Sequence, residues 1–474
     1  MHLHRHHLEF AGLLLALGVA SGCGGDPTAG YQPPGGGQAK GCRQSAEFAE
    51  PMAAGVGLSS HLEWRDDEVS EARRAFEIAR WTEIGARLIR RDLNWSILEP
   101  VRGEFDFTLA DRTVAAAESV GGEATGLLVY GNAWASESSD DTATPPDDPA
   151  DFGDYSAAVA ERYRSRIRRY EVWNEPNAGI RFWKPEEDPE AYGTLLIEAA
   201  DRVHEVDPDA LVSFGGLFHP PMFMTTPGPV FLDQVFDAHP GLAEHIDAVA
   251  FHPYRYPFTA PEEEETHESL VDSTCGLYEQ LEARGGGDLE LWITELGWHT
   301  APEAFVTGVS EAEQAAYLVR STLLAFAQGV PVYQWYTFRD SGDDPEDQEQ
   351  MFGLYGYDPD PTDGIEAAPK LAATAYATLT AQLGEHDRIE DLSMWLGLDA
   401  TTYAYLLSGG DGETVALWRV DGAIGVQLPA ETAVSVTTML GERTDVSPLD
   451  GAIEVTAGPD PVFVRVPGSR FVDR

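Results

Sequence analysis

Cysteine is scarce in this chain, which has three in 474 residues, too few for a disulfide framework. Basic residues are also few: 31 Lys and Arg stand against 80 Asp and Glu, which gives a formal net charge of −49. So acidic a surface is repelled by phosphate backbones, and we expect no nucleic-acid partner. The content of 43% hydrophobic and 23% charged residues is that of a globular protein and excludes a mainly disordered chain.

The N-terminus has the pattern of an export signal. A short basic start (1–7) precedes an apolar run of 13 residues (8–20), shorter than the roughly 20 residues that span a bilayer. The sequence Ala-Ser-Gly-Cys that ends at Cys23 resembles a bacterial lipoprotein cleavage box, although Ala20 stands where leucine is usual. We therefore expect a signal peptide (1–22), a lipidated Cys23 and an extracytoplasmic lipoprotein on a membrane or cell surface. Ordinary cleavage and secretion is the alternative.

A linker follows the expected lipidation site. Residues 24–41 are rich in Gly and Pro, with too little apolar surface to fold, so 23–46 is interpreted as the lipidated cysteine and a flexible tether. Cys42 and Cys275 remain in the exported chain. In an oxidising compartment they either form a disulfide or stay as two separate buried thiols.

Apolar, β-rich runs then recur along some three hundred residues. Their starts advance 276 residues over seven steps, about 39 each. The runs are 55–60, 86–93, 124–131, 169–174, 210–216, 246–252, 289–295 and 331–338. Helical patterns such as 312–328 lie between them, and eight strand–helix units are the number that closes a (β/α)8 barrel. We predict an α/β fold with a TIM barrel over 47–384. The alternative, an open doubly wound sheet, is weakened because no G-x-G-x-x-G follows the first strand.

The pattern changes after about residue 385. Six short strands are separated by turn residues such as Gly409-Gly410-Asp411-Gly412. This pattern predicts an all-β, sandwich-like accessory domain over 385–474.

Two glutamates stand at the ends of predicted strands. Glu175 follows the fourth run, and Glu295 ends the seventh. Functional groups of TIM barrels lie at the carboxyl ends of the strands, so both carboxylates should reach the same face. Two carboxylates across a cavity suit glycoside hydrolysis, in which one donates a proton and the other is ionised.

The surrounding residues carry a family resemblance. Trp173-Asn174-Glu175-Pro176-Asn177 on the fourth strand, with a glutamate ending the seventh, resembles retaining glycoside hydrolases of clan A. The style is closest to family 39 or family 5 over about residues 50–384. The resemblance implies that Glu175 is the general acid/base and that Glu295 is the nucleophile.

The same resemblance implies further roles. Asn174 matches the residue that hydrogen-bonds the sugar 2-hydroxyl, and Arg90 matches a second-strand arginine near the nucleophile. His252 and Tyr254 match the pair that orients the nucleophile. Trp335 matches the eighth-strand tryptophan that floors the subsite of the reacting sugar.

Six tryptophans fall at or near predicted strand ends: Trp64, Trp95, Trp134, Trp173, Trp298 and Trp335. An indole face packs well on the C–H face of a sugar, although a single tryptophan is as readily a core residue. We expect Trp134 and Trp335 to be the main sugar platforms and assign Trp298 to substrate binding as well.

Two acidic features have an ordinary interpretation. Glu171 lies inside the fourth strand, where we expect it to pair with an arginine of 164–169, and a supporting role inside the barrel is the alternative. The four-glutamate run 262–265 is expected to be solvated surface that rims the cleft or lies outside it.

Together these patterns predict a hydrolase of β-linked poly- or oligosaccharides that acts by a two-glutamate double displacement. No H-E-x-x-H or G-x-S-x-G motif is present, and we expect neither metal nor organic cofactor. The expected partners are the glycan substrate and, through the lipid anchor, a membrane, with the protein as a monomer. A transglycosylase using the same residues and a non-catalytic tethered glycan-binding protein are the alternatives.

Overall fold

The computed structural model describes residues 40–60, 68–137, 141–220, 225–264, 268–363, 367–410, 412–430 and 432–466. The predicted signal peptide, Cys23 and Trp64 lie outside these ranges. None of the helices in the described ranges is both long enough and apolar enough to cross a membrane.

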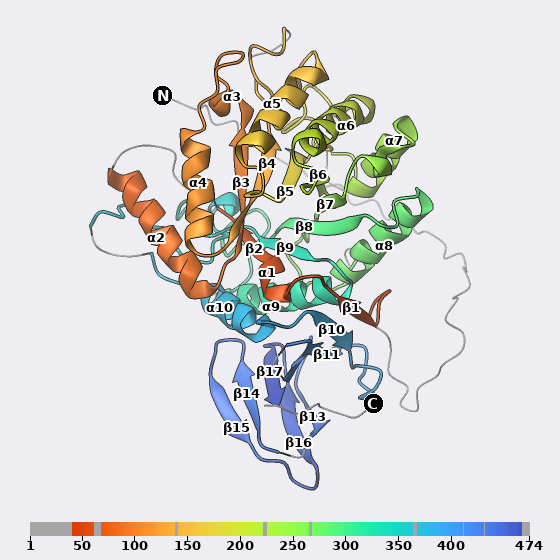
Figure 1. Cartoon of the computed structure of the whole chain (residues 1–474). Helices are drawn as coiled ribbons and strands as arrows, with labels where there is room; N and C mark the ends of the chain where they lie inside the picture. Colours follow the sequence, from red (N-terminus) through yellow and green to blue (C-terminus); the bar gives the residue numbers. More distant parts are fainter. Residues whose placement is uncertain are drawn as a thin grey trace.

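Eight parallel strands close into a barrel in sequence order, each paired with the next and the last with the first (Figure 1). They are β2 (Val56–Ser59), β3 (Leu88–Asn94), β4 (Glu123–Val129), β5 (Arg169–Asn174), β6 (Leu211–Phe218), β7 (Ala248–His252), β8 (Glu290–Leu296) and β9 (Val332–Trp335). The predicted TIM barrel is therefore confirmed, and the open sheet is excluded because β2 pairs with both β3 and β9.

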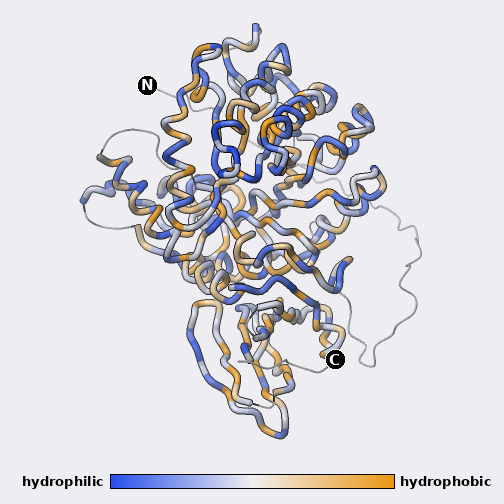
Figure 2. The backbone as a smooth tube through the Cα atoms, viewed as in Figure 1, coloured by the Kyte–Doolittle hydropathy of each residue, from blue (hydrophilic) through white to orange (hydrophobic). Residues whose placement is uncertain are grey.

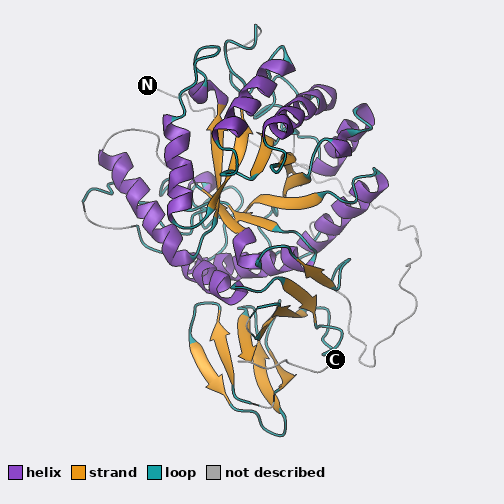
Figure 3. Ribbon diagram, viewed as in Figure 1, coloured by secondary structure: helices purple, strands orange, loops and turns teal. Residues whose placement is uncertain are grey.

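Helices surround the barrel and connect its strands (Figure 3). The long ones are α2 (Glu68–Ile84), α4 (Thr108–Ser119), α5 (Pro149–Arg162), α6 (Pro189–Val206), α7 (Gly228–Ala238), α8 (Leu270–Ala283), α9 (Glu311–Ala327) and α10 (Leu371–Leu383). Their starts have local causes: Ser310 and Glu313 form a capping box at α9, and Asp148 caps α5. Figure 2 shows apolar and hydrophilic stretches alternating along α5 and α6, as expected of helices with one buried face.

Short elements occupy the connections. They are α1 (Met52–Gly55), α3 (Trp95–Leu98), and the 3-10 helices η1 (Leu242–Glu244) and η2 (Gln348–Gln350). The 3-10 helix η2 lies in the connection that follows β9.

The C-terminal strands form two antiparallel sheets. The larger has the order β1 (Ser45–Glu47), β10 (Arg388–Asp391), β11 (Thr402–Ser408), β12 (Glu413–Arg419), β17 (Val462–Val466), β14 (Val434–Thr438) and β15 (Arg443–Val446). The smaller pairs β13 (Ile424–Pro429) with β16 (Ala452–Ala457). The edge strand β1 comes from a segment that the sequence assigned largely to the tether, so the accessory unit includes one strand that precedes the barrel in the chain.

The central strands of the larger sheet are buried on both faces. Along β11, Ala404 and Leu406 face the core that this unit shares with β13 and β16, whereas Tyr405 and Leu407 join the core of the barrel. Successive side chains of a strand point to opposite faces, so a sheet covered on both sides must be apolar at consecutive positions. The accessory unit is thus packed onto the barrel along a continuous apolar face.

A buried ion pair of the barrel lies at this interface and accepts a hydrogen bond from the accessory sheet. Glu262 accepts hydrogen bonds from Arg320 of α9 and from the indole of Trp418 of β12, the latter at 2.8 Å. Glu262 is 9% exposed and Arg320 2%. The expectation that this glutamate is solvated surface or rims the cleft is therefore wrong, because it supplies the acceptor that an otherwise unpaired buried arginine requires.

The second link is covalent. A disulfide joins Cys42, just before β1, to Cys275 of α8 across 233 residues. Of the two alternatives left open by the sequence, the structure has the disulfide. It attaches the N-terminal segment to the side of the barrel.

Candidate active site

A cavity of about 400 Å³ lies at the carboxyl ends of the barrel strands. It contains both predicted carboxylates, Glu175 and Glu295. Aromatic side chains form much of its wall: Tyr130, Phe182, Phe218, Tyr254, Tyr256, Phe258, Tyr336 and Phe352. A cavity of this size with an apolar wall and a few convergent charges has the character of a small-molecule or saccharide site.

Glu295, at the end of β8, is held from two sides. Arg90 of β3 donates from Nη1 to its Oε1, and the Tyr254 hydroxyl donates to its Oε2 at 3.2 Å. Its side chain is 13% exposed, so it keeps a path to the cavity. The structure thus brings Arg90 and Tyr254 to the predicted nucleophile.

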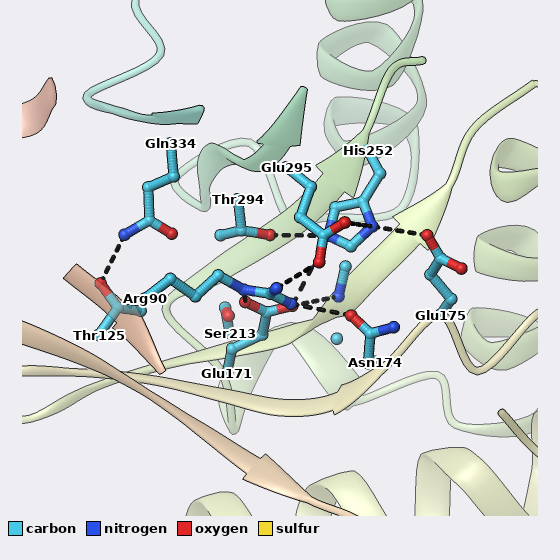
Figure 4. A network of polar contacts seen from close by, with 12 residues as sticks. Arg90, Thr125, Glu171, Asn174, Glu175, Ser213, His252, Thr294, Glu295 and Gln334 are labelled. Carbon is cyan, nitrogen blue, oxygen red and sulfur yellow. Dashed lines mark hydrogen bonds and ion pairs between the residues drawn. The ribbon is translucent and has the colours of Figure 1, made fainter. Parts of the chain in front are cut away.

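Arg90 is the centre of the polar network (Figure 4). Its Nε and Nη2 each donate to Glu171 at 2.9 Å, and Nη2 also donates to Asn174 Oδ1 at 2.9 Å. The predicted pairing of Glu171 with an arginine of 164–169 is wrong. By strand alternation this side chain points into the barrel, where Arg90 is within reach.

The charges around Arg90 hold it in its ionised form. Burial opposes the charge, but the carboxylates of Glu171 and Glu295 outweigh it and raise the pKa of Arg90 well above its ordinary value. Burial, followed by the charge of Glu295, raises the pKa of Tyr254 well above its ordinary value. Tyr254 therefore keeps its proton and remains a hydrogen-bond donor.

The loop that carries Glu175 has an unusual backbone. Trp173 and Glu175 both have positive φ, 70° and 45°, in the left-handed region that non-glycine residues rarely occupy. The Glu175 amide donates to Gly216 O at 3.0 Å. Buried Asn177 fixes the loop by donating to the carbonyls of Phe218 and Thr226 at 2.8 and 2.7 Å. These contacts hold the Glu175 side chain in the cavity.

His252 lies on the acid/base side of the pair. Its Nδ1 is 2.9 Å from Glu175 Oε1 and 3.9 Å from Glu295 Oε2, and its Nε2 is 3.1 Å from Thr294 Oγ1. His252 thus lies closer to Glu175 than to Glu295, the nucleophile that the resemblance expects it to orient. A Cβ at Gly216 would lie 2.0 Å from the imidazole, so this position requires glycine.

The two catalytic candidates are close together. One carboxylate oxygen of Glu175, one of Glu295 and a nitrogen of His252 lie within 4.8 Å of one another. Among the described residues this is also the group whose spacing suits a metal ion. The guanidinium of Arg90 on Glu295 already places one positive charge there, which opposes a second cation.

The tryptophan prediction must be corrected. Trp298 and Trp335 are fully buried and stack at 6.0 Å, away from the cavity surface. Trp134 is partly buried, with Arg102 over its ring at 4.4 Å and Trp95 edge-on at 5.1 Å, and it does not line the cavity. Trp95 and Trp173 are also fully buried. None of these five offers an open indole face to a sugar in the cavity.

Strand alternation explains the error at β9. The Gln334 side chain points into the barrel, where it donates to Thr125 Oγ1 at 2.8 Å, so Trp335 points outward and Tyr336 inward. Tyr336 lines the cavity, one residue beyond the predicted platform. The aromatic wall consists of Tyr and Phe from several loops, and no local sequence pattern identifies it.

The cavity is also lined by charged residues that the sequence analysis did not identify. Asp92 lies two residues after Arg90 on β3 and so faces the same side. Arg181 follows Glu175 in the loop after β5, and Glu349 comes from η2. The alternation of β3 could have identified Asp92, whereas Arg181 lies in a loop and Glu349 in the short helix η2, and neither segment has a periodic signal.

Known structures share this fold. No family model matches the chain, and no curated protein sequence matches it. A family 39 glycoside hydrolase from Bacteroides cellulosilyticus WH2 superimposes with a TM-score of 0.70 at 22% identity, covering 88% of this chain and 81% of that one. A family 39 β-xylosidase from Caulobacter crescentus gives 0.60 at 18% identity, covering 90% and 98%. A family 39 enzyme from Xanthomonas axonopodis pv. citri gives 0.59 at 17%, covering 90% and 96%. The resemblance to clan A is thus confirmed at the level of the fold.

Proposed function

We propose that this protein is a retaining glycoside hydrolase that cleaves β-linked oligo- or polysaccharides. The observation that carries the proposal is the pair Glu175 and Glu295, whose nearest oxygens lie within 4.8 Å across one cavity. Retaining enzymes have carboxyl groups about 5–5.5 Å apart, and inverting enzymes leave about 6.5–9.5 Å for a water molecule. The shared fold of family 39 hydrolases supports the same reaction class.

The reaction takes two displacements. Glu295 attacks the anomeric carbon while Glu175 gives its proton to the leaving oxygen, so that the glycosidic bond breaks and a glycosyl ester forms on Glu295. Water then attacks the same carbon while Glu175 takes a proton from it. The ester bond breaks, and Glu295 returns as a carboxylate, with Glu175 protonated again.

The surrounding residues fit these roles. Arg90 and Tyr254 hold Glu295 by charge and hydrogen bond, which favours its ionised form as the leaving carboxylate and orients it for attack. His252 contacts Glu175. The Asn174 side-chain oxygen accepts a hydrogen bond from Arg90. The NH2 group of Asn174 is then available to donate to a sugar hydroxyl at the cavity.

The test uses two variants and one matched control. Glu175→Gln and Glu295→Gln should each lower kcat on aryl β-glycosides at least about 1,000-fold, because each removes a group that forms or breaks a bond. Exposed Glu118→Gln, which removes a surface partner of Arg166, should leave kcat unchanged. NMR of the first product should show the substrate's anomeric configuration. Full activity in either cavity variant, or an inverted product, would refute the proposal.

Substrate and location are part of the proposal. One structural neighbour is a β-xylosidase, so β-xylosides, β-glucosides, mannan and galactan form the first panel, with excess acceptor sugar added to separate hydrolysis from transfer. The Cys42–Cys275 disulfide supports an oxidising, extracytoplasmic compartment. Lipidation of Cys23 predicts that Cys23→Ser releases the protein from the membrane fraction.

A further inference from the structure

Two arginines line the catalytic cavity, and their surroundings differ. Arg90 uses its donors on Glu171, Glu295 and Asn174. Arg181 lines the same cavity, yet no carboxylate in the described part of the chain forms an ion pair with its guanidinium. Arg181 is exposed to solvent, so a charged ligand can reach its guanidinium.

Aromatic packing holds Arg181 in place of an ion pair. Its guanidinium carbon lies 4.7 Å from the centre of the Phe182 ring, which stacks on Tyr130 at 5.9 Å with an interplanar angle of 6°. The Phe182 carbonyl accepts a hydrogen bond from the Trp173 indole at 2.7 Å. Stacking supports the guanidinium through its face, so its N–H donors stay available at the edge.

Arg181 lies on the side of the cavity where the leaving group of the proposed reaction would bind. It follows Glu175 by six residues in one loop, together with Ala178 and Ile180, which also line the cavity. In the proposed reaction Glu175 gives its proton to the leaving oxygen. The wall that continues from Glu175 therefore borders the part of the substrate that departs.

We propose that Arg181 binds an acidic group, a carboxylate or a sulfate, on the leaving-group side of the scissile bond. The planar guanidinium offers parallel N–H donors that match two oxygens of such a group. The enzyme then favours glycans that carry a negative charge next to the bond it cleaves. This inference rests on the proposed function, because it assigns the leaving-group side from the role of Glu175.

Glu349 faces Arg181 from the other side of the mouth. It comes from η2 after β9, the barrel strand opposite β5 in the closed order. Removal from water raises the pKa of Glu349, Arg181 and the Gln348 amide lower it, and the charges of Glu295 and Glu175 raise it again, with a net rise. Glu349 therefore takes up a proton at a higher pH than an ordinary glutamate, and this removes one of the carboxylate charges that act on Arg181, while those of Glu175 and Glu295 remain.

The experiment measures binding rather than turnover. The probes are two aryl 1-thio-β-xylosides that resist cleavage, one with a carboxylate and one with a carboxamide on the aryl ring, and the same pair of thio-β-glucosides. Calorimetry on the whole protein gives the ratio of the two dissociation constants. In the unmodified protein the carboxylate should bind about 10- to 100-fold more tightly than the carboxamide, as expected of a charge-assisted bidentate contact.

Arg181→Gln should bring that ratio close to one, and Arg181→Lys should keep part of it. The control Arg102→Gln, an exposed arginine paired with Asp151 outside the cavity, should leave the ratio unchanged. In the unmodified protein the ratio should fall as the pH rises and Glu349 ionises. Glu349→Gln should raise the ratio severalfold and remove this fall. A sulfonate in place of the carboxylate distinguishes sulfated from carboxylated substrates.

The inference fails if the carboxylated probe has no advantage in the unmodified protein. It also fails if Arg181→Gln weakens both probes by the same factor, which would indicate a merely structural arginine. Because no bond is broken in this assay, its result is separate from that of the Glu175 and Glu295 variants, whose full activity would refute the proposed reaction instead.

Discussion

The buried networks around Arg320 and around Arg90 each combine an arginine with glutamates, and they serve different ends. At the barrel–sheet interface, Arg320 donates both its Nε and its Nη2 to Glu262, whose remaining capacity goes to Trp418. At the cavity, Arg90 joins Glu171 and Glu295, and Glu295 retains 13% exposure (Figure 4).

The difference shows that a buried charge is not by itself a functional site. The interface network is closed: its donors and acceptors are matched, and it orients one structural unit on another. The cavity network is open on one side, so one carboxylate is held and charged but is still able to reach a ligand. Access to the cavity, rather than residue type or burial, separates the two.

The largest effect expected at the open network is on chemistry. Glu295→Gly should lower kcat at least about 1,000-fold, and azide should restore activity by forming a glycosyl azide of inverted configuration. Glu175→Gly should be rescued with retained configuration, because azide then attacks the glycosyl ester. NMR of the azide products distinguishes the two, and exchanged configurations would mean that the two roles are reversed.

The closed network should affect stability instead. Glu262→Ala leaves Arg320 buried without its partner and should lower the free energy of unfolding by about 3–5 kcal/mol, measured by denaturant titration. Activity per folded molecule should not change, since Glu262 is absent from the cavity wall. Adding Arg320→Met should recover part of the loss. A fall in kcat with unchanged stability would contradict the distinction between the networks.

A third buried group, His299, should affect how stability depends on pH. His299 is fully buried behind Phe258 and Phe352 of the cavity wall, and burial, then Lys370, lowers its pKa to about 4. The unfolded chain takes up the proton near pH 6.5, so stability should be lost as the pH falls from about 6.5 towards 4, by at most about 3 kcal/mol. Melting temperatures should therefore decline less steeply over this range in His299→Asn than in the unmodified protein. The control is His245→Asn, a partly exposed histidine, and equal slopes for His299→Asn and the unmodified protein would contradict the assignment.

Much of the fold could be predicted from the sequence because its strand–helix units recur at regular spacing. The eight β-rich runs and the two strand-end glutamates predicted the barrel and the positions of Glu175 and Glu295, and Arg90 faces the cavity network as expected. The tryptophans were misassigned because the position of a residue in a strand decides to which side its side chain points. Trp335 and Tyr336 are neighbours in sequence but point to opposite sides. Glu171 and Glu262 were misjudged for a related reason, since their partners Arg90 and Arg320 lie 81 and 58 residues away.

The sequence by itself determined the periodic features, because strand and helix patterns depend on neighbours within a few positions. It fixed the number of barrel strands, the β-rich C-terminal unit and the level at which the two glutamates emerge. Only the tertiary structure decided which charges meet, which aromatic residues line the cavity, that Cys42 pairs with Cys275, and that Arg181 forms no ion pair with another described residue. Those outcomes depend on contacts between loops that are distant in the chain, and the closing of the barrel, rather than any local pattern, brings such loops together.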